Sequence, residues 1–541
     1  MNNALFSFQN PDNEPILGYL KGSPEREKLV KELDRQSNTE IEIPLIIGGK
    51  EVRTGVTKKV TMPHDHHHVL ATFHCATEET VKMAIESALK AKEDWQRMPW
   101  EERGAIMLRA AELLAKPYRA TINAATMLGQ SKNPFQAEID SACELIDFLR
   151  YNVFFASQIY SDQPKSDATQ LNRTEYRPLE GFVYAISPFN FTSIASNLNM
   201  SPILMGNTTI WKPATTAVLS NYYVAKIYKE AGLPDGVLNF LPGQGSVISN
   251  VAFNHRALAG IHFTGSTSTF KNFWKTIGNN LDNYISYPKI VGETGGKDFI
   301  FVHNSSNPLE VATAIVRGAF EFQGQKCSAA SRAYIPKSIW NEVRKHVEKQ
   351  ASEIKMGDVK DFTNLMNAVI DEKSFDNIMS FVNQAKTDKS CEFVCGGNGD
   401  KSKGYFIEPT LIKTTDPHSA TMVNELFGPV ITVYVYDDDK YEETLELCNT
   451  TSPYALTGSI FGYDRKAVLV AFEKLKYAAG NFYINDKPTG ATVGWQPFGG
   501  SRASGTNDKA GSMLNLFRWT NPRAIKETFL PPTYFDYPYM R

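Results

Sequence analysis

The sequence lacks any long apolar run. A membrane-spanning helix needs about 20 consecutive apolar residues, and no stretch of this 541-residue chain approaches that length. It also lacks an excess of either charge, with 57 lysines and arginines against 59 aspartates and glutamates. Nucleic-acid-binding surfaces usually carry a clear excess of positive charge. We therefore expect neither a membrane nor a nucleic acid among the partners of this protein.

Cysteine is scarce, with six residues in the whole chain. Only Cys391 and Cys395 lie close together, and a lone C-x-x-x-C pair is weak evidence for a metal site. We predict no metal, reduced thiols and an intracellular location. No arginine precedes Arg26 and no basic region leads into an apolar stretch, which favours the cytoplasm. A processed protein of the mitochondrial matrix is the alternative.

Local patterns predict several elements in the first part of the chain. Thr77 fits the N-cap of a helix, and helical spacing of apolar residues predicts a long helix from Gln136 to Ile159. A group of histidines precedes these helices. Successive side chains of a strand point to opposite faces, so we favour a surface loop entering a strand over a metal site for His64, His66, His67 and His68.

Strands and helices alternate from Pro178 onward. Apolar runs predict four buried strands, at 181–187, 208–213, 236–243 and 259–266, with helical segments between them. A second alternating block, which includes a predicted strand at Phe406–Ile412, begins at Lys297. Such alternation is typical of βαβ units, whose parallel sheets bind ligands at the carboxyl ends of the strands. The sequence therefore predicts an α/β protein with two such domains.

One cysteine has neighbours suited to chemistry. Cys327 stands in Phe322-Gln323-Gly324-Gln325-Lys326-Cys327-Ser328-Ala329. Small neighbours leave the sulfur accessible, and the adjacent Lys326 would favour the nucleophilic thiolate. A buried packing cysteine is the alternative, because free thiols are often buried. No histidine is placed to pair with Cys327, which disfavours a thiol hydrolase that needs no cofactor.

Four other stretches accompany this cysteine motif. Three of them end predicted strands, and the fourth precedes a predicted strand. They are Ser187-Pro188-Phe189-Asn190-Phe191, Trp211-Lys212-Pro213-Ala214, Phe263-Thr264-Gly265-Ser266 and Asn424-Glu425-Leu426-Phe427-Gly428-Pro429. Together with the glycine-rich turn Val291-Gly292-Glu293-Thr294-Gly295-Gly296-Lys297, their order resembles the aldehyde dehydrogenase superfamily from about Leu45 to about Asn521. The resemblance implies the fold of that superfamily, with a Rossmann-like dinucleotide-binding domain and an α/β catalytic domain.

Within the superfamily the likeness is narrower. Gly-Gln-Lys-Cys-Ser-Ala and the runs Thr489–Gly500 and Arg502–Asp508 resemble the 1-pyrroline-5-carboxylate dehydrogenases. That family oxidises L-glutamate γ-semialdehyde to L-glutamate with NAD, as the second step of proline degradation. Another semialdehyde dehydrogenase, such as one acting on succinate semialdehyde, is the alternative. A non-catalytic member of the fold is disfavoured by the intact Cys327, Glu293 and Asn190.

The resemblance assigns three catalytic roles. Cys327 is expected to attack the aldehyde carbon. The side-chain amide of Asn190 and the backbone N–H of Cys327 are expected to stabilise the oxyanion that forms. Glu293 is expected to activate the water that hydrolyses the thioester, and its neighbours Gly295 and Gly296 predict a flexible backbone there. A helix cap or a solvated carboxylate is the alternative for Glu293.

The resemblance also implies NAD as the cofactor. Lys212 would bind the adenosine ribose, and Glu425 the nicotinamide ribose, with Phe427 packing nearby. A helix that opens with Gly265, Ser266, Thr267, Ser268 and Thr269 would offer backbone N–H groups to the pyrophosphate. No G-x-G-x-x-G fingerprint is present. The glutamate with which many members reject a 2′-phosphate is replaced by Ala214, Thr215 or Thr216, so NADP stays open.

The substrate's far end carries an amino and a carboxylate group. The resemblance implies that Phe191 and Phe498 flank its aliphatic chain. Small residues allow backbone N–H groups to approach a carboxylate, and the residues implied in that role are Ser187, Ser328, Gly490 and Ala491. Some members carry serine in place of Ala491. An ordinary turn is the alternative at Gly490-Ala491.

These inferences divide the chain into four parts. We predict an N-terminal extension over 1–42, an NAD-binding domain over 43–159 and 178–290, a catalytic domain over 291–519, and oligomerisation segments at 160–177 and 520–541. The polar run 160–177 could not bury a core of its own, so a partner surface would explain its order. We expect a homodimer or a higher homo-oligomer.

Overall fold

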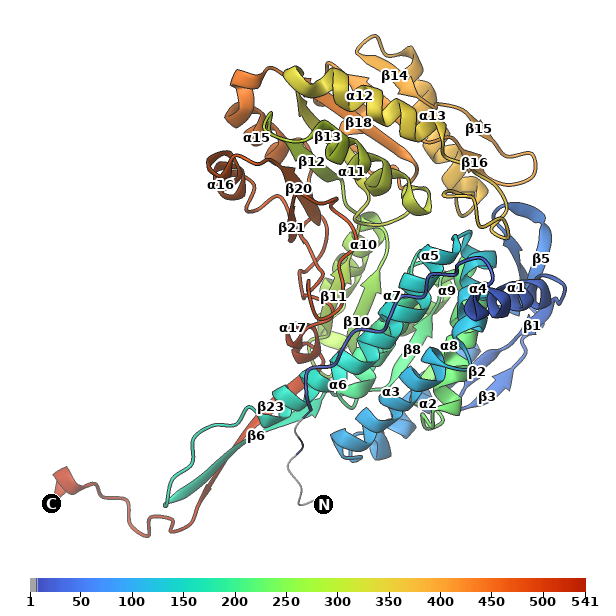
Figure 1. Ribbon diagram of the computed structural model, residues 1–541. Coiled ribbons are helices and arrows are strands. Elements are labelled where there is room, and N and C mark those ends of the chain that lie inside the picture. Colours follow the sequence, from blue (N-terminus) through green and yellow to red (C-terminus); the bar gives the residue numbers. More distant parts are fainter. Residues whose placement is uncertain (1–5, 7) are drawn as a thin grey trace.

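The computed structural model describes residue 6 and residues 8–541, and it contains two large α/β domains (Figure 1). Residues 1–5 and 7 of the predicted N-terminal extension lie outside the described part. The first domain is built on a seven-stranded sheet of order β11-β10-β7-β8-β9-β2-β3. Its strands are β11 (Lys289–Glu293), β10 (Leu258–Thr264), β7 (Phe182–Ile186), β8 (Thr209–Lys212), β9 (Leu238–Phe240), β2 (Leu45–Ile47) and β3 (Lys50–Val52).

The strands from β11 to β9 are parallel, as the alternating pattern predicts. β7 and β10 are buried along their whole length, which explains their continuous apolar runs. Helices enclose this sheet. They are α2 (Glu78–Trp95), α3 (Trp100–Ala115), α4 (Arg119–Gln130), α5 (Pro134–Ala137), α6 (Leu145–Ser161), α7 (Thr192–Leu204), α8 (Val218–Glu230), α9 (Gly245–Asn254) and α10 (Thr267–Gly278).

Two sequence predictions about these helices have clear outcomes. The side chain of Thr77 accepts the N–H of Thr80 at the start of α2, so the predicted N-cap is confirmed. The predicted helix Gln136–Ile159 is continuous but changes type. Its segment η1 (Glu138–Glu144), between α5 and α6, is a π-helix. The wider turn changes which side chains of this segment share a face.

The second domain has its own seven-stranded sheet, of order β14-β17-β18-β13-β12-β20-β21. Its strands are β14 (Cys391–Cys395), β17 (Thr410–Thr414), β18 (Val430–Tyr436), β13 (Ala330–Pro336), β12 (Asp298–Val302), β20 (Thr457–Phe461) and β21 (Asn481–Ile484). Only the pair β14–β17 is antiparallel in this described sheet. The predicted strand Phe406–Ile412 is wrong as a single element. It breaks at Pro409, which has no N–H for a ladder, into β16 (Phe406–Ile407) and β17.

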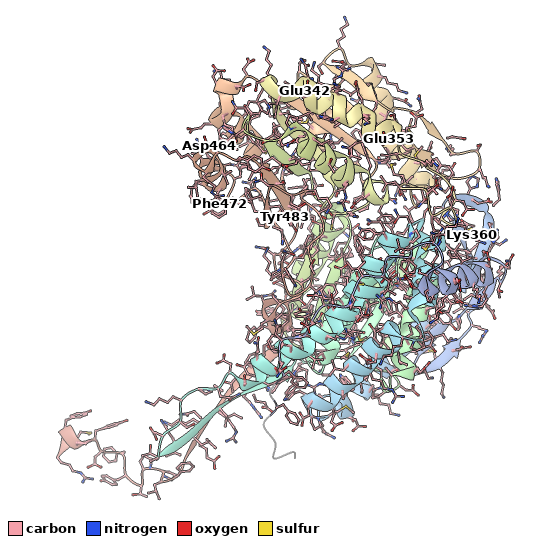
Figure 2. The ribbon with its side chains drawn as sticks, in the orientation of Figure 1. Glu342, Glu353, Lys360, Asp464, Phe472 and Tyr483 are labelled. Atoms are coloured by element: carbon pink, nitrogen blue, oxygen red, sulfur yellow. The ribbon has the colours of Figure 1, made fainter. Side chains whose placement is uncertain are left out.

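Helices flank the second sheet (Figure 2). They are α11 (Pro308–Phe320), α12 (Lys337–Ser352), α13 (Glu372–Thr387), α14 (Ala420–Val423), α15 (Tyr441–Thr450) and α16 (Arg465–Lys474). The smaller elements are α1 (Pro24–Ser37), α17 (Met513–Phe517), β1 (Ile41–Ile43), β4 (Thr57–Met62), β5 (Asp65–His74), β15 (Gly399–Asp400), β19 (Tyr454–Ala455) and β22 (Ser501–Arg502).

The hairpin of β4 and β5 carries the histidine group and reaches the second domain. The backbone N–H of His66 donates to Lys403 O at 2.9 Å, and that of Tyr405 donates to Pro63 O at 3.0 Å. Lys360, labelled in Figure 2, adds a contact of 2.8 Å with Asp34 of α1. The predicted surface loop is wrong for His64, which is only 3% exposed. This hairpin therefore helps to fix the two domains against each other.

A two-stranded ribbon projects from the body of the molecule (Figure 1). β6 (Gln170–Pro178) pairs antiparallel with β23 (Thr520–Thr528), from Thr520 opposite Pro178 to Thr528 opposite Gln170. The C-terminal residues continue beyond the tip of this ribbon. The two segments predicted to mediate oligomerisation thus lie side by side, and their role in assembly stays a prediction.

Candidate active site

Strand ends of the first domain meet a turn of the second. β10 and β11 run parallel, so their last residues Thr264 and Glu293 lie opposite each other. Asn190 follows β7, and its side-chain amide donates to Gln325 O at 3.0 Å. Gln325 stands two residues before Cys327. The predicted catalytic residues are thereby brought to one place between the domains, at the carboxyl ends where parallel sheets bind ligands.

The turn that leads to Cys327 has a strained backbone. Phe322 and Gln323 both adopt left-handed conformations, with φ of 51° and 54°. Such values are uncommon outside glycine and persist only where the surroundings enforce them. The Gln323 side chain supplies this restraint, because it donates to Ser131 O and Ala368 O at 3.0 and 2.9 Å and accepts Asn367 N–H at 3.0 Å. The chain is thus turned sharply after α11 to present Cys327.

The thiol of Cys327 is not activated by its neighbour in sequence. Lys326 lies 3.2 Å from Glu321, so its charge is directed away, and the predicted help from this cation is wrong. The pKa of Cys327 is instead raised well above its usual value, first by burial and then by the nearby carboxylates of Glu293 and Asp298. The thiol is therefore protonated in the resting site, and a base must take its proton before attack.

Glu293 is held in a sheet. It is the last residue of β11 and forms a further bridge with Gly505, so the predicted flexible backbone is wrong at this position. Its Oε2 atom is buried with no hydrogen-bond partner in the described chain. Burial raises its pKa well above the ordinary value, Lys509 opposes this rise, and Asp508 adds to it. A carboxylate with a raised pKa is a better base near neutral pH.

The two predicted oxyanion donors both have a hydrogen that is not used within the described structure. Asn190 is 3% exposed, and one hydrogen of its amide is engaged with Gln325. An amide group has two such hydrogens, and the second has no partner among residues 8–541. The N–H of Cys327 likewise donates to no group of the described backbone. Both predicted oxyanion donors are therefore available to a ligand.

The residues predicted to bind a dinucleotide line the adjoining strand ends. Lys212 ends β8, and burial lowers its pKa to about 8. The Oγ1 atom of Thr264 is buried without a partner in the described structure. Ser266 caps α10 by accepting the N–H of Thr269, so α10 begins at Thr267, slightly later than Gly265. Ser268 lies in its first turn, where free N–H groups favour a pyrophosphate.

Glu425 and Phe427 precede β18 in the second domain and contact residues of the glycine-rich turn and of the stretch after β7. A Cβ added to Gly295 would lie 2.0 Å from Glu425 Oε2, so the carboxylate of Glu425 packs directly on this glycine. Glu425 also accepts the N–H of Gly296 at 2.9 Å, and burial raises its pKa to about 7. The ring of Phe427 meets Phe189 edge-on at 5.7 Å. A buried cation, the first turn of a helix and a buried carboxylate are groups that suit the phosphates and ribose hydroxyls of a dinucleotide.

The residues predicted to hold the substrate fall into two groups. The hydroxyl of Ser328 donates to Thr489 at 3.0 Å, which joins the Cys327 turn to the turn that carries Gly490 and Ala491. Gly490 has a φ of 103°, a conformation that favours glycine. Ser187 differs, because its buried hydroxyl already accepts the indole N–H of Trp211 at 2.9 Å. It is engaged in the core of the first domain.

Comparison with known proteins identifies the fold and its family. The model of the aldehyde dehydrogenase family matches residues 52–525. The chain belongs to this family. One relative is the mitochondrial delta-1-pyrroline-5-carboxylate dehydrogenase of Dictyostelium discoideum, which is 53% identical over 540 residues, covering 99% of this chain and 97% of the relative. The human mitochondrial protein of the same name is 46% identical over 530 residues, covering 98% and 94%.

A solved structure shows the same fold. The delta-pyrroline-5-carboxylate dehydrogenase from Mycobacterium tuberculosis, crystallised with NAD, superposes with a TM-score of 0.96 at 49% identity, and the match covers 100% of both chains. The α/β aldehyde dehydrogenase fold predicted from the sequence is confirmed. The catalytic, cofactor-binding and substrate-binding roles of individual residues stay predictions.

The geometry suits the chemistry of an aldehyde dehydrogenase. Once the thiol proton of Cys327 has passed to water, its Sγ atom can attack the aldehyde carbon, and the resulting oxyanion can accept hydrogen bonds from Asn190 and from the Cys327 N–H. NAD, when bound at the strand ends, supplies the acceptor for the hydride that leaves this carbon. Glu293 can then take a proton from water as that water attacks the thioester, which releases the acid and the thiol.

Two residues of this aldehyde dehydrogenase site were missed from the sequence. Lys297 has a buried ammonium with no partner in the described chain, and burial lowers its pKa to about 7. Burial and Asp140 raise the pKa of Glu144 to about 8, and its charge acts on Cys327. Glu144 ends the π-helix η1. Helical periodicity alone could not place it, because a π-helix shifts every following side chain around the axis.

Proposed function

We propose that this chain oxidises L-glutamate γ-semialdehyde to L-glutamate with NAD, as the second step of proline degradation. The hydrogen bond of 3.0 Å from Ser328 to Thr489 carries this proposal, because it couples the nucleophile's turn to the turn of Gly490 and Ala491. A substrate with an aldehyde at one end and an aminocarboxylate at the other could then react at Cys327 while its far end contacts Gly490 and Ala491. Relatives that cover nearly the whole chain at 46–53% identity are named delta-1-pyrroline-5-carboxylate dehydrogenase, which supports this substrate over succinate semialdehyde.

The polar end of the substrate fits the groups around this turn. Gly490 and Ala491 have little or no side chain, so backbone N–H groups could approach a carboxylate. Glu144, which lies near Cys327 and accepts the hydroxyl of Ser193 at 2.9 Å, could accept a hydrogen bond from the ammonium group. Phe191 and Phe498 are both partly buried and would flank the aliphatic carbons. Backbone donors for the carboxylate and an acceptor for the ammonium group would favour glutamate γ-semialdehyde over succinate semialdehyde, which lacks the amino group.

The test is spectrophotometric. Purified protein is mixed with NAD and either glutamate γ-semialdehyde or succinate semialdehyde, and the absorbance of the reduced nicotinamide is followed. We expect a higher kcat/KM for glutamate γ-semialdehyde, since only this substrate carries the amino group. A preference for succinate semialdehyde would overturn the proposal. The same assay with NADP tests the cofactor, with NAD expected to give the higher rate.

We further propose a homo-oligomer assembled through the ribbon of β6 and β23. The residues beyond β23 are rich in exposed apolar side chains, and a patch of this kind usually marks an interface. They include Phe529 at 53%, Leu530 at 89%, Tyr534 at 67%, Phe535 at 73% and Tyr539 at 84% exposure. Truncation after Asn521 should lower the mass measured by light scattering. An unchanged mass would contradict this assembly.

The state of the cysteines and the names of relatives support a proposal for the cell compartment. All six cysteines are free thiols, as expected in a reducing compartment. No helix among the described residues has the length and apolarity to cross a membrane. We propose the cytoplasm or the mitochondrial matrix, and the Dictyostelium and human relatives are both named mitochondrial.

A further inference from the structure

The side chain of Asn13 makes four hydrogen bonds between distant parts of the chain. Its amide Nδ2 donates to Asp147 Oδ2 at 2.7 Å and to Val493 O at 2.9 Å. Its Oδ1 accepts Tyr151 O–H at 3.0 Å and Trp495 Nε1–H at 2.8 Å. Two donors and two acceptor positions are the full capacity of an asparagine amide. Asn13 therefore joins α6 to the segment that contains Val493 and Trp495.

That segment, residues 489–498, is the loop proposed to bind the substrate. It carries Gly490, Ala491 and Phe498, and it contains no helix or strand. Its two ends are anchored within the second domain. Thr489 is bonded by Ser328 and Lys487, and Phe498 exchanges two backbone hydrogen bonds with Ala510. The middle of the loop depends on other contacts.

The contacts of the loop's middle come from the N-terminal segment and from α6. Tyr151 packs so closely that a Cβ added to Gly494 would lie 2.2 Å from its ring. Val493 is buried against Phe148 and Tyr151. Asn13 supplies the two polar contacts, one to the backbone at Val493 and one to the indole of Trp495. Directional hydrogen bonds fix the loop's position along α6, which apolar packing alone does not.

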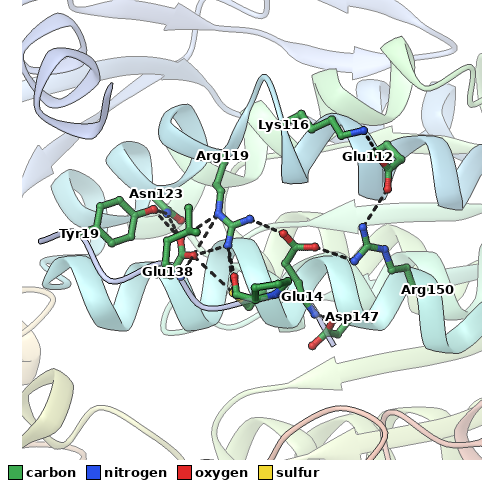
Figure 3. A network of polar contacts seen from close by, with 12 residues as sticks. Glu14, Tyr19, Glu112, Lys116, Arg119, Asn123, Glu138, Asp147 and Arg150 are labelled. Carbon is green, nitrogen blue, oxygen red and sulfur yellow. Dashed lines mark hydrogen bonds and ion pairs between the residues drawn. The ribbon is translucent and has the colours of Figure 1, made fainter. Parts of the chain in front are cut away.

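The N-terminal segment is itself firmly held (Figure 3). Glu14 pairs with Arg119 at 2.5 Å and with Arg150 at 2.7 Å. Glu138, which is completely buried, accepts the backbone N–H of Leu17 at 2.9 Å and the hydroxyl of Tyr19 at 2.7 Å. Buried ion pairs with several hydrogen bonds are costly to break. Asn13 is thus presented to the loop by a fixed support.

We propose that Asn13 is a positioning residue that sets substrate selectivity by holding loop 489–498 over the site. This inference rests on the proposed function, in which the loop binds the substrate's aminocarboxylate. Asn13 lies outside residues 52–525, which the family model matches. It touches neither the substrate's expected position nor the Cys327 turn, so it acts through the loop. The recognition of the polar end is therefore sensitive to the N-terminal segment, whereas the chemistry at Cys327 is not.

The first test compares kinetic constants. In Asn13→Ala we expect KM for glutamate γ-semialdehyde to rise about tenfold, the effect of losing one good interaction. The kcat, the KM for NAD and the KM for propanal, which has no aminocarboxylate, should change less than about twofold. Asn38→Ala is the matched control, because Asn38 bonds only within its own helix end, to Asp34 O at 2.8 Å. Equal changes for both aldehydes would overturn the inference.

The second test measures the loop directly and does not depend on the substrate. Hydrogen exchange of the backbone amides in 489–498 should be faster in Asn13→Ala than in the wild-type protein, and unchanged in Asn38→Ala. Unchanged exchange in Asn13→Ala overturns the inference whatever the substrate. Faster exchange with an unchanged KM ratio overturns the selectivity role. A wild-type enzyme that does not prefer glutamate γ-semialdehyde overturns the proposed function, while the exchange result still decides the anchoring.

A milder variant covers the case in which Asn13→Ala does not fold. Trp495→Phe removes a single donor to Asn13, because phenylalanine lacks the indole N–H, and Trp495 is 71% exposed. It should raise the KM for glutamate γ-semialdehyde and speed hydrogen exchange in the loop, both by less than Asn13→Ala does. If Asn13→Ala does fold, the double variant should show less than the sum of the two effects, because both act on one contact. Full additivity would contradict the inference.

Discussion

Lys132 and Asp140 form an ion pair of 2.6 Å, and both side chains are almost completely buried. The ammonium of Lys132 also lies 4.2 Å from the centroid of the Phe191 ring and 4.4 Å from that of Phe322. Phe191 is the predicted wall of the substrate site, and Phe322 belongs to the strained turn before Cys327. One cation thus supports two parts of the site through cation–π contacts.

We predict that Lys132→Met lowers stability by about 3–5 kcal/mol, because a buried carboxylate loses its partner. The backbone N–H groups of Thr192 and Ser193 still donate to Asp140, so the loss should stay below that of a bare charge. Urea unfolding measures the change. Lys116→Met is the matched control, because the ion pair of Lys116 with Glu112 is exposed at the surface. This variant should lower the free energy of unfolding by less than about 1 kcal/mol. Equal effects would contradict the role of burial.

Replacement of the nucleophile should separate binding from chemistry. We expect Cys327→Ser to abolish production of reduced nicotinamide, because a hydroxyl is a far weaker nucleophile at neutral pH. NAD binding, measured by calorimetry, should persist. Cys391→Ser, at a partly exposed cysteine of β14, is the control and should keep its activity. Near wild-type turnover of Cys327→Ser would rule out the assignment.

Replacement of the base should make hydrolysis of the thioester the rate-limiting step. In Glu293→Gln we expect a single-turnover burst of reduced nicotinamide and then a slow steady state, because the amide cannot accept a proton from water. If both phases slow equally, Glu293 positions the thiol instead.

The pH profile provides a separate measurement of the same site. The pKa values of Cys327 and Glu293 are both raised, and both groups act in their deprotonated forms. The kcat/KM of the wild-type enzyme should therefore rise as pH increases above neutrality. The Glu293→Gln profile should lose one of the two titrations.

Much of this arrangement followed from the sequence, because apolar runs and turn residues are local. The alternation of strands and helices predicted both sheets, and the ordered motifs placed Asn190, Glu293 and Cys327 together. The charge state of Cys327 did not follow. Lys326 is adjacent in sequence, but its side chain turns to Glu321, and the carboxylates that act on the thiol come from other elements. Electrostatics depend on distance in space, which spacing along the chain does not give.

The supporting contacts were missed for a related reason. Asn13 and Val493 are joined by a hydrogen bond of 2.9 Å although 480 positions separate them. Asparagine is common in loops whatever its contacts, so nothing in its neighbourhood indicates such a bond. His64 shows the opposite error. The alternation of side chains along a strand disfavoured a metal site and led to the prediction of a surface loop, but the packing of the β4–β5 hairpin against the second domain buries His64.

The burial of His64 predicts a loss of stability in mild acid. Burial lowers its pKa to about 4, and its Nε2 atom has no hydrogen-bond partner in the described chain. The unfolded chain, with a histidine pKa of about 6.5, binds more protons below that pH. Stability should therefore fall as pH drops from about 6.5 toward about 4, by up to about 1.4 kcal/mol per pH unit.

The groups that face His64 are Asp358 at 3.7 Å, Ser131 at 3.2 Å, Asp65, Lys403 and His68. His64→Gln should reduce the slope of unfolding free energy against pH, measured in urea at several pH values. A residual slope is expected from His262, whose pKa burial lowers to about 3. His67→Gln, at an exposed position, is the control. An unchanged slope in His64→Gln would refute the prediction.

The final prediction concerns the far end of the substrate. Ala491→Trp should fill the space that the aminocarboxylate needs, next to Gly490 and the bond between Ser328 and Thr489. A carboxylate deprived of its donors loses several kcal/mol, and each ~1.4 kcal/mol is tenfold in rate. We expect a large loss of kcat/KM for glutamate γ-semialdehyde and a smaller loss for propanal, because the chemistry at Cys327 lies at the other end of the substrate. Equal losses for the two aldehydes would show that residue 491 affects the whole site, and the proposed aminocarboxylate contact would then be wrong.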